Sequence, residues 1–285
     1  MAVEHFQYKG INFSLPIYSV ESLDFAENQF QALDSDVFNV TYPKSGTHWI
    51  LEILSLIRTN GDPAWARSVP LWLRSPWIEA VDAQIKGVEP PRALCSHLPR
   101  QLFCKSVFRS KAKIIYTLRN PKDVMVSLFF FAKSVCCYQD PETFEQLLED
   151  FLKGDVLYGS WFDHVKGWMK MKNEGNFFYI TYEELLQDPR DSVVRICNFL
   201  GKDLDDAAID SVVENSTFKA MKENEMSNYS HLKLDYIDES KSAFYRKGIS
   251  GDWKNHFTVA QNEHFDKVYQ EHMKDCGFNF FWEKK

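Results

Sequence analysis

Residues 42–49 combine side chains whose types and spacing suit the binding of an anion. The octet reads Tyr-Pro-Lys-Ser-Gly-Thr-His-Trp and overlaps the end of the apolar run Val37–Tyr42, which predicts a strand. The residues that follow, Trp49–Ile57, have the apolar pattern of a helix. At such a junction, free backbone N–H groups and the positive end of the helix dipole point at one place. The octet is therefore a predicted anion-binding loop.

Four residues within the octet support this prediction. Lys44 adds a full positive charge, and Ser45 and Thr47 add hydroxyl donors. Gly46 carries no side chain, so the backbone can come close to a ligand. The lysine precedes the glycine, unlike the Gly-x-x-x-x-Gly-Lys-Ser/Thr pattern of nucleoside-triphosphate loops. The alternative is an ordinary strand–turn–helix connection, because Pro-Lys-Ser-Gly also suits a turn.

Two further stretches could bind an anion. Arg119 follows a predicted strand, where arginine can grip a phosphate with two N–H groups, and Ser127 lies about two helical turns later. A surface arginine and a helix serine are the alternative. Residues 246–253, Arg-Lys-Gly-Ile-Ser-Gly-Asp-Trp, place two cations beside a turn that can wrap an anion. This second stretch could equally be a solvated basic loop.

His97 has surroundings that suggest acid–base chemistry. It lies in Leu-Cys-Ser-His-Leu-Pro, residues 94–99, at the predicted end of a strand or in a loop. An imidazole with a pKa near neutrality can take a proton from an attacking hydroxyl, although a lone histidine is more often structural. No cluster of histidine and cysteine has the spacing of zinc ligands, so no metal site is predicted.

These residues need a scaffold, and the chain predicts an α/β fold with a mainly parallel central sheet flanked by helices. The clearest predicted strands are Val37–Tyr42, Lys113–Leu118 and Phe177–Thr181. Further helices are predicted at Pro141–Leu152, Arg190–Leu200, Asp205–Glu214 and Ala260–Met273. Ligands of parallel sheets bind beyond the carboxyl ends of the strands. Because Lys44, Arg119 and Tyr182 follow the three strands, we expect them to converge on one edge.

The composition predicts a single domain over residues 1–285. Of the 285 residues 45% are hydrophobic, and no linker rich in Pro, Gly or Ser divides them. The net charge of −7 argues against a general nucleic-acid binder. The longest dense apolar run, Val124–Ala132, is too short to span a bilayer, and no signal peptide is expected. Six cysteines without framework spacing suit a reducing compartment, so we expect a cytosolic protein.

Taken together, these stretches resemble the cytosolic sulfotransferase family over essentially the whole chain. The resemblance is carried by Tyr42–Trp49, Ser96–Pro99, Arg119–Asp123 with Ser127, Tyr182–Leu185 and Arg246–Trp253. Residues 157–164 and 221–230 are most similar to the hydroxysteroid (alcohol) branch. Phenol- and estrogen-type relatives carry a lysine two residues before the catalytic histidine. This chain has Cys95 there, which again favours the alcohol branch.

The resemblance implies 3′-phosphoadenylyl sulfate (PAPS) as donor and adenosine 3′,5′-bisphosphate (PAP) as its product. Lys44 to Trp49 would hold the 5′-phosphosulfate, and the residues around Arg119 and Arg246 would hold the 3′-phosphate, which explains the two basic sites. His48 replaces the asparagine or threonine of many relatives and is expected to face the donor side or solvent. The implied donor site is Lys44, Ser45, Gly46, Thr47, His48, Trp49, Arg119, Ser127, Tyr182, Ser216, Thr217, Phe218, Met221, Arg246, Lys247 and Gly248.

The family's reaction implies transfer of the sulfuryl group to a hydroxyl of an apolar acceptor, such as a hydroxysteroid, bile acid or other alcohol. His97 is the implied general base, Lys44 stabilises the leaving group, and Ser127 restrains Lys44 until the acceptor binds. No metal is implied. A phenol or amine is the alternative acceptor. A small-molecule kinase and a non-catalytic binder of apolar ligands are more remote alternatives.

The resemblance also implies an acceptor pocket and a homodimer. Candidates for the pocket walls are Trp72, Trp77, Phe131, Tyr229 and Tyr236, the last two on a loop that acts as a lid. The segment Lys254–Glu263 matches the family's dimer motif Lys-x-x-x-Thr-Val-x-x-x-Glu through Lys254, Thr258, Val259 and Glu263. An interface of this size implies weak dimerisation. Neither a membrane nor a nucleic acid is an expected partner.

Overall fold

A four-stranded parallel sheet forms the centre of the molecule. The computed structural model describes residues 4–15, 17–81, 83, 85, 87–230, 237–277, 280 and 282. Within these residues the sheet has the order β4-β3-β5-β6, with every neighbouring pair parallel. Its strands are β3 (Val37–Thr41), β4 (Ala93–Ser96), β5 (Lys113–Leu118) and β6 (Phe177–Thr181). The sequence predicts three of them to within one residue. For β4 the prediction gave no bounds and placed only His97, at the end of a strand or in a loop.

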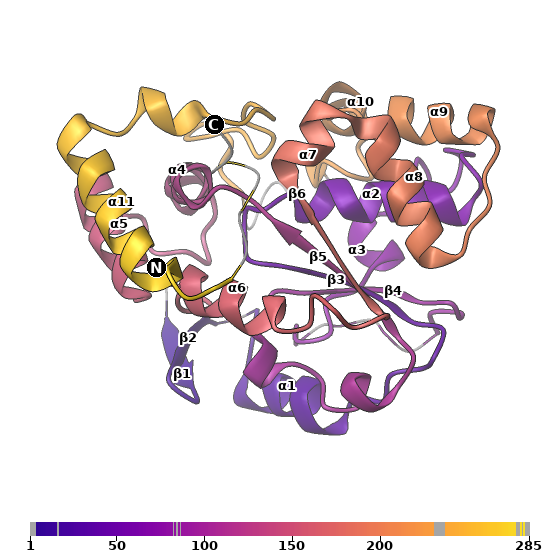
Figure 1. Ribbon diagram of the computed structural model, residues 1–285, viewed down its shortest axis with the longest axis horizontal. Helices are drawn as coiled ribbons and strands as arrows, with labels where there is room; N and C mark the ends of the chain where they lie inside the picture. The colour runs from indigo at the N-terminus through magenta and orange to yellow at the C-terminus, as the bar shows by residue number, and fades with distance from the viewer. Residues whose placement is uncertain are drawn as a thin grey trace.

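Helices cover both faces of this sheet (Figure 1). One side carries α2 (Thr47–Arg58), α7 (Tyr182–Gln187), α8 (Pro189–Leu200), α9 (Asp206–Asn215) and α10 (Phe218–Glu223). The other side carries α4 (Pro121–Ser134), α5 (Phe144–Lys153), α6 (Trp161–Met169) and α11 (Val259–Met273). The smaller elements are β1 (His5–Tyr8), β2 (Ile11–Ser14), α1 (Val20–Asp24), α3 (Leu71–Arg74) and short turns at Phe25–Gln29, Arg100–Leu102, Val107–Arg109 and Asp252–Asn255.

The two faces follow from the alternation of side chains along buried strands. On β5, Ile114 and Tyr116 pack into the hydrophobic cluster that includes α5, α6 and α11. Ile115 packs into the other cluster, with residues of α2, α8 and α9. A strand covered on both sides reads as a continuous apolar run, which is why Lys113–Leu118 was predictable. The fold class expected from the sequence is confirmed.

Helix bounds differ from the predictions where capping residues decide them. The helix expected at Pro141–Leu152 begins at Phe144, because Thr143 accepts a hydrogen bond from the backbone N–H of Gln146. Thr258 caps α11 in the same way, so this helix begins at Val259, one residue before the expected Ala260. No helix was predicted over α6. Its more exposed positions, Asp163, Lys166, Gly167 and Lys170, nevertheless recur at helical spacing opposite a buried apolar face, so the periodicity of a helix is present there.

The carboxyl edge of the sheet gathers the connections that carry candidate site residues. β3 leads into α2 through the loop 42–46, and β4 ends just before His97. After β5, the Asn120 side chain caps α4 with Pro121 in its first turn. After β6, Thr181 forms a capping box that begins α7 at Tyr182. These local signals bring Lys44, Arg119 and Tyr182 together, as predicted.

Candidate active site

The loop between β3 and α2 exposes the beginning of the helix to a ligand. Lys44 and Gly46 both have left-handed backbone angles, with φ of 69° and 102°. Gly46 precedes α2 without a side-chain cap, so backbone N–H groups of the first turn remain for an anion. A Cβ atom at Gly46 would lie 2.9 Å from the Tyr182 ring. The positive φ and this close contact together require glycine.

Lys44 lies in a setting that disfavours its charged form. Its Nζ atom is 3.6 Å from the ring centre of Phe131 and 5.5 Å from that of Phe244. Burial, assisted by the nearby Arg119 and Arg246 cations, lowers the pKa of Lys44 to about 7. An anion placed beside this amine would reverse that shift, because it favours the protonated form. The loop lysine is thus arranged to gain a proton when a negative group binds.

Arg119 has a buried polar atom beside the loop that suits a ligand. Among the described residues, its Nε atom is one of those without a hydrogen-bond partner, as is Ser45 Oγ. The other arginine nitrogens donate to the carbonyl oxygens of Lys44 and Ile249, at 2.9 and 3.0 Å, and the guanidinium lies 4.2 Å above the Tyr182 ring. Buried polar groups in proteins are normally hydrogen-bonded. Donors left over at this place therefore fit a ligand with acceptor oxygens, such as the phosphates of PAPS.

The second predicted anion site is organised by one carboxylate. Arg246 Nη1 and Lys247 Nζ donate to the two oxygens of Asp252 at 2.7 and 2.6 Å. Burial of Asp252 works against its charge, but hydrogen bonds from Lys247, Asn255 and Arg246 outweigh it and hold its pKa well below the usual range. The loop is therefore more than a solvated basic segment, because Asp252 holds both cations in place.

Aromatic residues lie next to both cationic groups. Trp49 and Tyr182 meet edge to face at 5.4 Å between ring centres. Gly248 has φ of 67°, and a Cβ atom there would come within 2.2 Å of the Phe218 ring. Flat rings at this position suit the stacking of a nucleobase. Ser216, Thr217, Phe218 and Met221, predicted to help bind the base, border the same space.

A cavity of about 860 Å³ joins the predicted donor residues, His97 and the predicted acceptor walls. Ser45 is the exception, because it is fully buried beneath the loop. Tyr236 lies outside the described residues. The predicted residues that border the cavity are Lys44, Gly46, Thr47, His48, Trp49, Trp72, Trp77, His97, Arg119, Ser127, Phe131, Tyr182, Ser216, Thr217, Phe218, Met221, Tyr229, Arg246, Lys247 and Gly248.

The hydrogen bonds of His97 define which nitrogen can act as a base. Nδ1 lies 2.9 Å from the carbonyl oxygen of Thr41. A carbonyl oxygen can only accept, so Nδ1 carries the hydrogen of the neutral ring and Nε2 keeps its lone pair. Burial, with a smaller opposing effect of the Thr41 carbonyl, lowers the pKa of His97 to about 4. The ring is therefore neutral at pH 7, the state that a general base requires.

A buried carboxylate fixes the backbone at His97. The His97 N–H donates to Glu79 Oε1 at 2.7 Å, and Glu79 is fully buried. Burial raises the pKa of Glu79 to about 7, while the His97 N–H opposes that rise. The imidazole packs 5.3 Å from the Tyr158 ring and 6.0 Å from the Trp77 ring. Glu79 was not predicted, since nothing in Trp-Ile-Glu-Ala marks it as a partner of position 97.

The acceptor end has further aromatic residues that sequence reasoning missed. Tyr18, Tyr138, Tyr158 and Phe244 all border the cavity. The Tyr18 and Tyr158 hydroxyls are 2.6 Å apart and buried. The ring centres of Phe244 and Phe131 are 5.9 Å apart. Phe244 could have been predicted from its position, two residues before Arg246. Tyr18 comes from the N-terminal part of the chain and carries no such signal.

His48 lies among the predicted acceptor walls and is partly buried. Its Nε2 atom is 3.0 Å from the Tyr229 hydroxyl, and its ring lies 6.0 Å from Trp77 and 5.2 Å from Phe244. Burial, with the nearby Lys44 charge, lowers the pKa of His48 to about 3, so the ring is neutral. We expected this side chain to face the donor side or solvent. It turns toward the predicted acceptor walls instead, because Tyr229 provides its polar partner.

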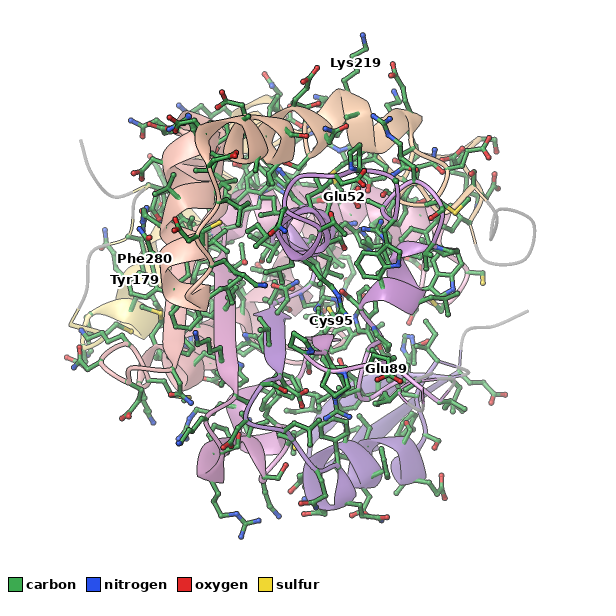
Figure 2. All side chains as sticks on the ribbon, turned by 90° about the vertical axis from the view of Figure 1, so that its right-hand side faces the viewer. Glu52, Glu89, Cys95, Tyr179, Lys219 and Phe280 are labelled. Atoms are coloured by element: carbon green, nitrogen blue, oxygen red, sulfur yellow. The ribbon has the colours of Figure 1, made fainter. Side chains whose placement is uncertain are left out.

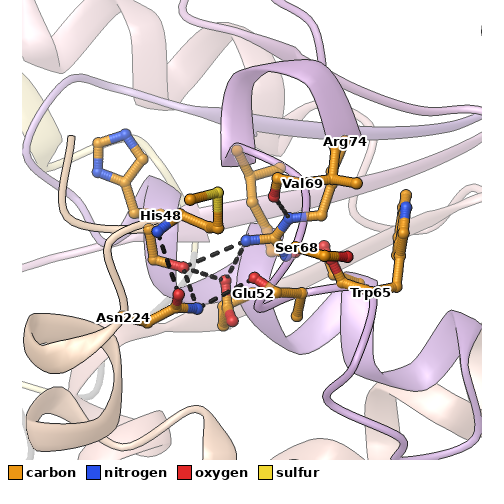
Figure 3. A network of polar contacts seen from close by, with 12 residues as sticks. His48, Glu52, Trp65, Ser68, Val69, Arg74 and Asn224 are labelled. Atoms are coloured by element: carbon orange, nitrogen blue, oxygen red, sulfur yellow. Dashed lines mark hydrogen bonds and ion pairs between the residues drawn. The ribbon is translucent and has the colours of Figure 1, made fainter. Parts of the chain in front are cut away.

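A buried ion pair supports this wall (Figure 3). Trp72 stacks on Tyr229 with ring centres 5.0 Å apart. Arg74, two residues after Trp72, donates to Glu52 of α2 at 2.8 Å, and Ser227 donates to the same carboxylate oxygen at 2.8 Å. Both charged side chains are at most 2% exposed. The network joins α2, α3 and the segment 224–230, the three parts of the chain that supply this side of the pocket.

Cys95 takes no part in the cavity surface. It is fully buried beside Leu51, Leu71 and Trp77, and Figure 2 shows it inside the molecule, whereas Lys219 projects from the surface. The cavity therefore has no cation from position 95. Elsewhere in the described part of the chain, no three His, Cys, Asp or Glu side chains come together as metal ligands. The prediction of no metal site stays a prediction.

Comparison with known proteins places the chain in a family. Residues 34–277 match the family model described as the sulfotransferase domain. The chain belongs to the sulfotransferase family. This sulfotransferase is 54% identical to Sulfotransferase 2B1 of Rattus norvegicus over 283 residues, which cover 99% of this chain and 83% of that protein. It is 50% identical to the 3-beta-hydroxysteroid sulfotransferase of Cavia porcellus over 280 residues, 97% of each chain.

A solved structure agrees with the assignment. The crystal structure of mouse sulfotransferase SULT7A1 complexed with PAP has a TM-score of 0.81 and 36% identity, and 95% of each chain is covered. The family recognition and the prediction of a sulfotransferase are therefore confirmed. The individual roles of site residues stay predictions. Over the described residues, no helix is both long enough and apolar enough to cross a bilayer.

Proposed function

We propose that this sulfotransferase moves the sulfuryl group of PAPS to a hydroxyl of a hydroxysteroid. The observation that carries the proposal is one continuous cavity, which is lined by cations such as Lys44 and Arg119, by aromatic side chains and by His97. The name of the Cavia porcellus relative supports a hydroxysteroid as acceptor, and the PAP bound to the SULT7A1 structure supports the donor. A bile acid or another alcohol would suit the same walls.

The donor would use the polar groups that the protein itself leaves incompletely bonded. The N–H groups at the start of α2, with Lys44 and Ser45, suit the 5′-phosphosulfate. Arg119 Nε, with Arg246 and Lys247, suits the 3′-phosphate, since guanidinium groups bind phosphate bidentately. Trp49, Tyr182 and the segment 216–221 would hold the adenine. PAPS supplies an activated sulfuryl group when it is bound, and the protein orients that group toward the acceptor end.

His97 would remove the acceptor's proton. The lone pair of Nε2 is free for this task because Nδ1 is committed to Thr41. The acceptor O–H bond would break as its oxygen bonds to sulfur, the proton would end on Nε2, and the bond between sulfur and the phosphate oxygen of PAPS would break to release PAP. Negative donor groups near the imidazole raise the pKa of His97 from its low value in the ligand-free protein. The base then works nearer to the pH of the solution.

Lys44 would neutralise the charge that develops on the leaving oxygen. Its low pKa in the ligand-free protein reflects burial and neighbouring cations, and both effects are offset once phosphates arrive. Ser127 of α4 borders the same cavity and is proposed to restrain Lys44 until the acceptor binds. Positioning and electrostatic stabilisation of this kind supply most of the catalysis in the related phosphoryl transfers.

A panel of acceptors tests the proposed substrate class. We expect the specificity constant for a 3-hydroxysteroid to exceed that of a simple phenol by at least ~10-fold, because the long aromatic chamber buries the steroid's apolar surface. Initial rates with labelled PAPS over hydroxysteroids, bile acids, phenols and amines would measure this ratio. Equal or higher specificity constants for phenols or amines would assign the alternative acceptor class.

We also propose that the segment 254–263 forms a homodimer. Val259 is 76% exposed at the start of α11, and Lys254, Thr258 and Glu263 are exposed around it. An apolar side chain this open to solvent suits a small two-fold contact. Val259→Glu should shift the sedimentation coefficient from dimer to monomer, because two carboxylates would meet at the axis. A Val259→Glu protein that remains fully dimeric would contradict the proposal, and Val20→Glu, at an exposed valine outside the motif, is the control.

The wider predictions concern the domain organisation, the location and the partners. We propose that residues 1–285 form a single sulfotransferase domain, which is supported by the family match across most of the chain. The cytosolic location and the absence of nucleic-acid and membrane partners rest on the sequence alone.

A further inference from the structure

A short chain of hydroxyl groups connects His97 with the beginning of α2. Thr41 is the last residue of β3 and is fully buried. Its Oγ1 atom lies 2.7 Å from Thr47 Oγ1 and 3.2 Å from His97 Nδ1. One buried threonine therefore contacts both the predicted base and the first residue of the helix that is predicted to bind the donor.

The direction of these hydrogen bonds follows from what each atom can donate. His97 Nδ1 carries its hydrogen, which points between the carbonyl oxygen and Oγ1 of Thr41. Thr41 Oγ1 is an acceptor in this contact, so its own hydrogen goes to Thr47 Oγ1. The Thr47 hydroxyl hydrogen then remains for an acceptor in the cavity, which Thr47 borders. At the positive end of α2, that acceptor is an anionic oxygen.

We propose that Thr41 is a positioning residue that couples donor binding to the base, an inference that rests on the proposed function. An anionic donor oxygen that accepts from Thr47 polarises the two hydroxyls in series, which makes Thr41 Oγ1 a stronger acceptor for Nδ1–H. The ring is then held with its lone pair on Nε2. The imidazolium that forms when Nε2 takes the acceptor's proton is stabilised at the same time. No proton travels along the chain of hydroxyls.

A neighbouring threonine provides a matched control. Thr117 of β5 is the register partner of Thr41 and is also fully buried. Within the described residues, its hydroxyl has no hydrogen-bond partner. Replacing either threonine by valine removes one buried hydroxyl from the same layer of the sheet. Thr41→Val removes the link between His97 and Thr47, whereas Thr117→Val removes no hydrogen bond within the part of the protein that the structure describes, and Thr117 is not among the residues that border the cavity.

The test compares Thr41→Val, Thr41→Ser and Thr117→Val in steady-state kinetics and in PAP binding by calorimetry. We expect Thr41→Val to lower kcat by about 10- to 100-fold, the range of one hydrogen bond to a charged group. The KM for PAPS and the Kd for PAP should stay within about twofold of wild type. Thr41→Ser should restore kcat to within a few-fold, and Thr117→Val should match wild type.

Several results would overturn the coupling. They are an unchanged kcat in Thr41→Val, an equal loss in Thr117→Val, or a Thr41→Ser variant as slow as the valine variant. The kinetics of the variants are measured with whichever acceptor the wild type turns over fastest. If hydroxysteroids are not turned over at all, the proposed function is contradicted, but the variants can still be compared with the other acceptor. If Thr41→Val does not fold, NMR of the wild-type His97 ring decides. PAP should move the Nδ1–H resonance downfield, and an unmoved resonance would contradict the inference.

Discussion

Replacement of His97 by alanine is expected to lower turnover by ~10²–10⁴-fold, the usual contribution of a positioned general base. The structure gives the physical reason, because Nδ1 is committed to the Thr41 carbonyl and Nε2 is left with the lone pair. PAP binding should be nearly unchanged, since the proposed phosphate-binding groups lie on the α2 loop and on the Arg119 and Arg246 segments. Turnover is measured with a saturating hydroxysteroid, and PAP affinity by calorimetry.

His264→Ala is the matched control for this variant. His264 is exposed on α11, where its ring contacts Glu149 of α5, and it lies outside the cavity lining. Its replacement should leave turnover at the wild-type level. If His97→Ala keeps near wild-type turnover while it binds PAP normally, the assignment of the base is wrong. If PAP binding collapses as well, the role of His97 is structural.

Replacement of Lys44 by methionine should lower kcat by ~10²–10³-fold, as the loss of one charge-stabilising donor does in other group transfers. Methionine keeps the length and apolar character that pack against Phe131 and Phe244, so the loop should hold its shape. The effect should appear in kcat more than in the KM for PAPS, because the additional negative charge on the leaving oxygen begins to develop only as the transition state forms. Single-turnover rates separate this loss from product release.

Proton uptake gives a second readout for Lys44. Burial, together with Arg119 and Arg246, holds its pKa at about 7 in the ligand-free protein. A bound anion raises that pKa, so between about pH 7 and pH 10 wild type should take up a proton with PAP, and PAP affinity should fall as pH rises. Calorimetry at pH 8 in two buffers of different ionisation enthalpy measures the uptake. Lys44→Met should abolish it, and an unchanged uptake in that variant would assign it to another group.

The donor side was predictable because its signals are local. Lys44, Arg119 and Tyr182 each follow a strand whose apolar run marks it clearly, and each lies just before or at the start of a helix. The parallel sheet then places all three at one edge. β4 was missed because Ala93–Ser96 is only four residues long, and it becomes a strand through its pairing with β3. The sequence therefore located His97 only as a residue near the end of a strand or in a loop.

The acceptor side depends on contacts between distant segments, which local patterns do not contain. Tyr18 and Tyr158 are 140 residues apart in sequence yet share a hydrogen bond. His48 turns toward the acceptor walls because Tyr229, 181 residues away, accepts or donates its hydrogen bond. Asp252, the partner of the Arg246 and Lys247 cations, lies in the same stretch, residues 246–253. An aspartate that only forms part of a turn and one that holds two cations in place cannot be told apart in the sequence.

Transfer of labelled sulfur tests whether the protein moves the sulfuryl group of PAPS to a hydroxysteroid. The purified protein is incubated with ³⁵S-labelled PAPS and a 3-hydroxysteroid, and the products are separated and identified by mass spectrometry. We expect a steroid sulfate and PAP in equal amounts, formed at the same rate with or without a magnesium chelator and absent when the acceptor is omitted. A γ-labelled ATP control should label nothing. Failure of the label to reach any hydroxyl acceptor, or transfer from ATP in its place, would contradict the proposed function.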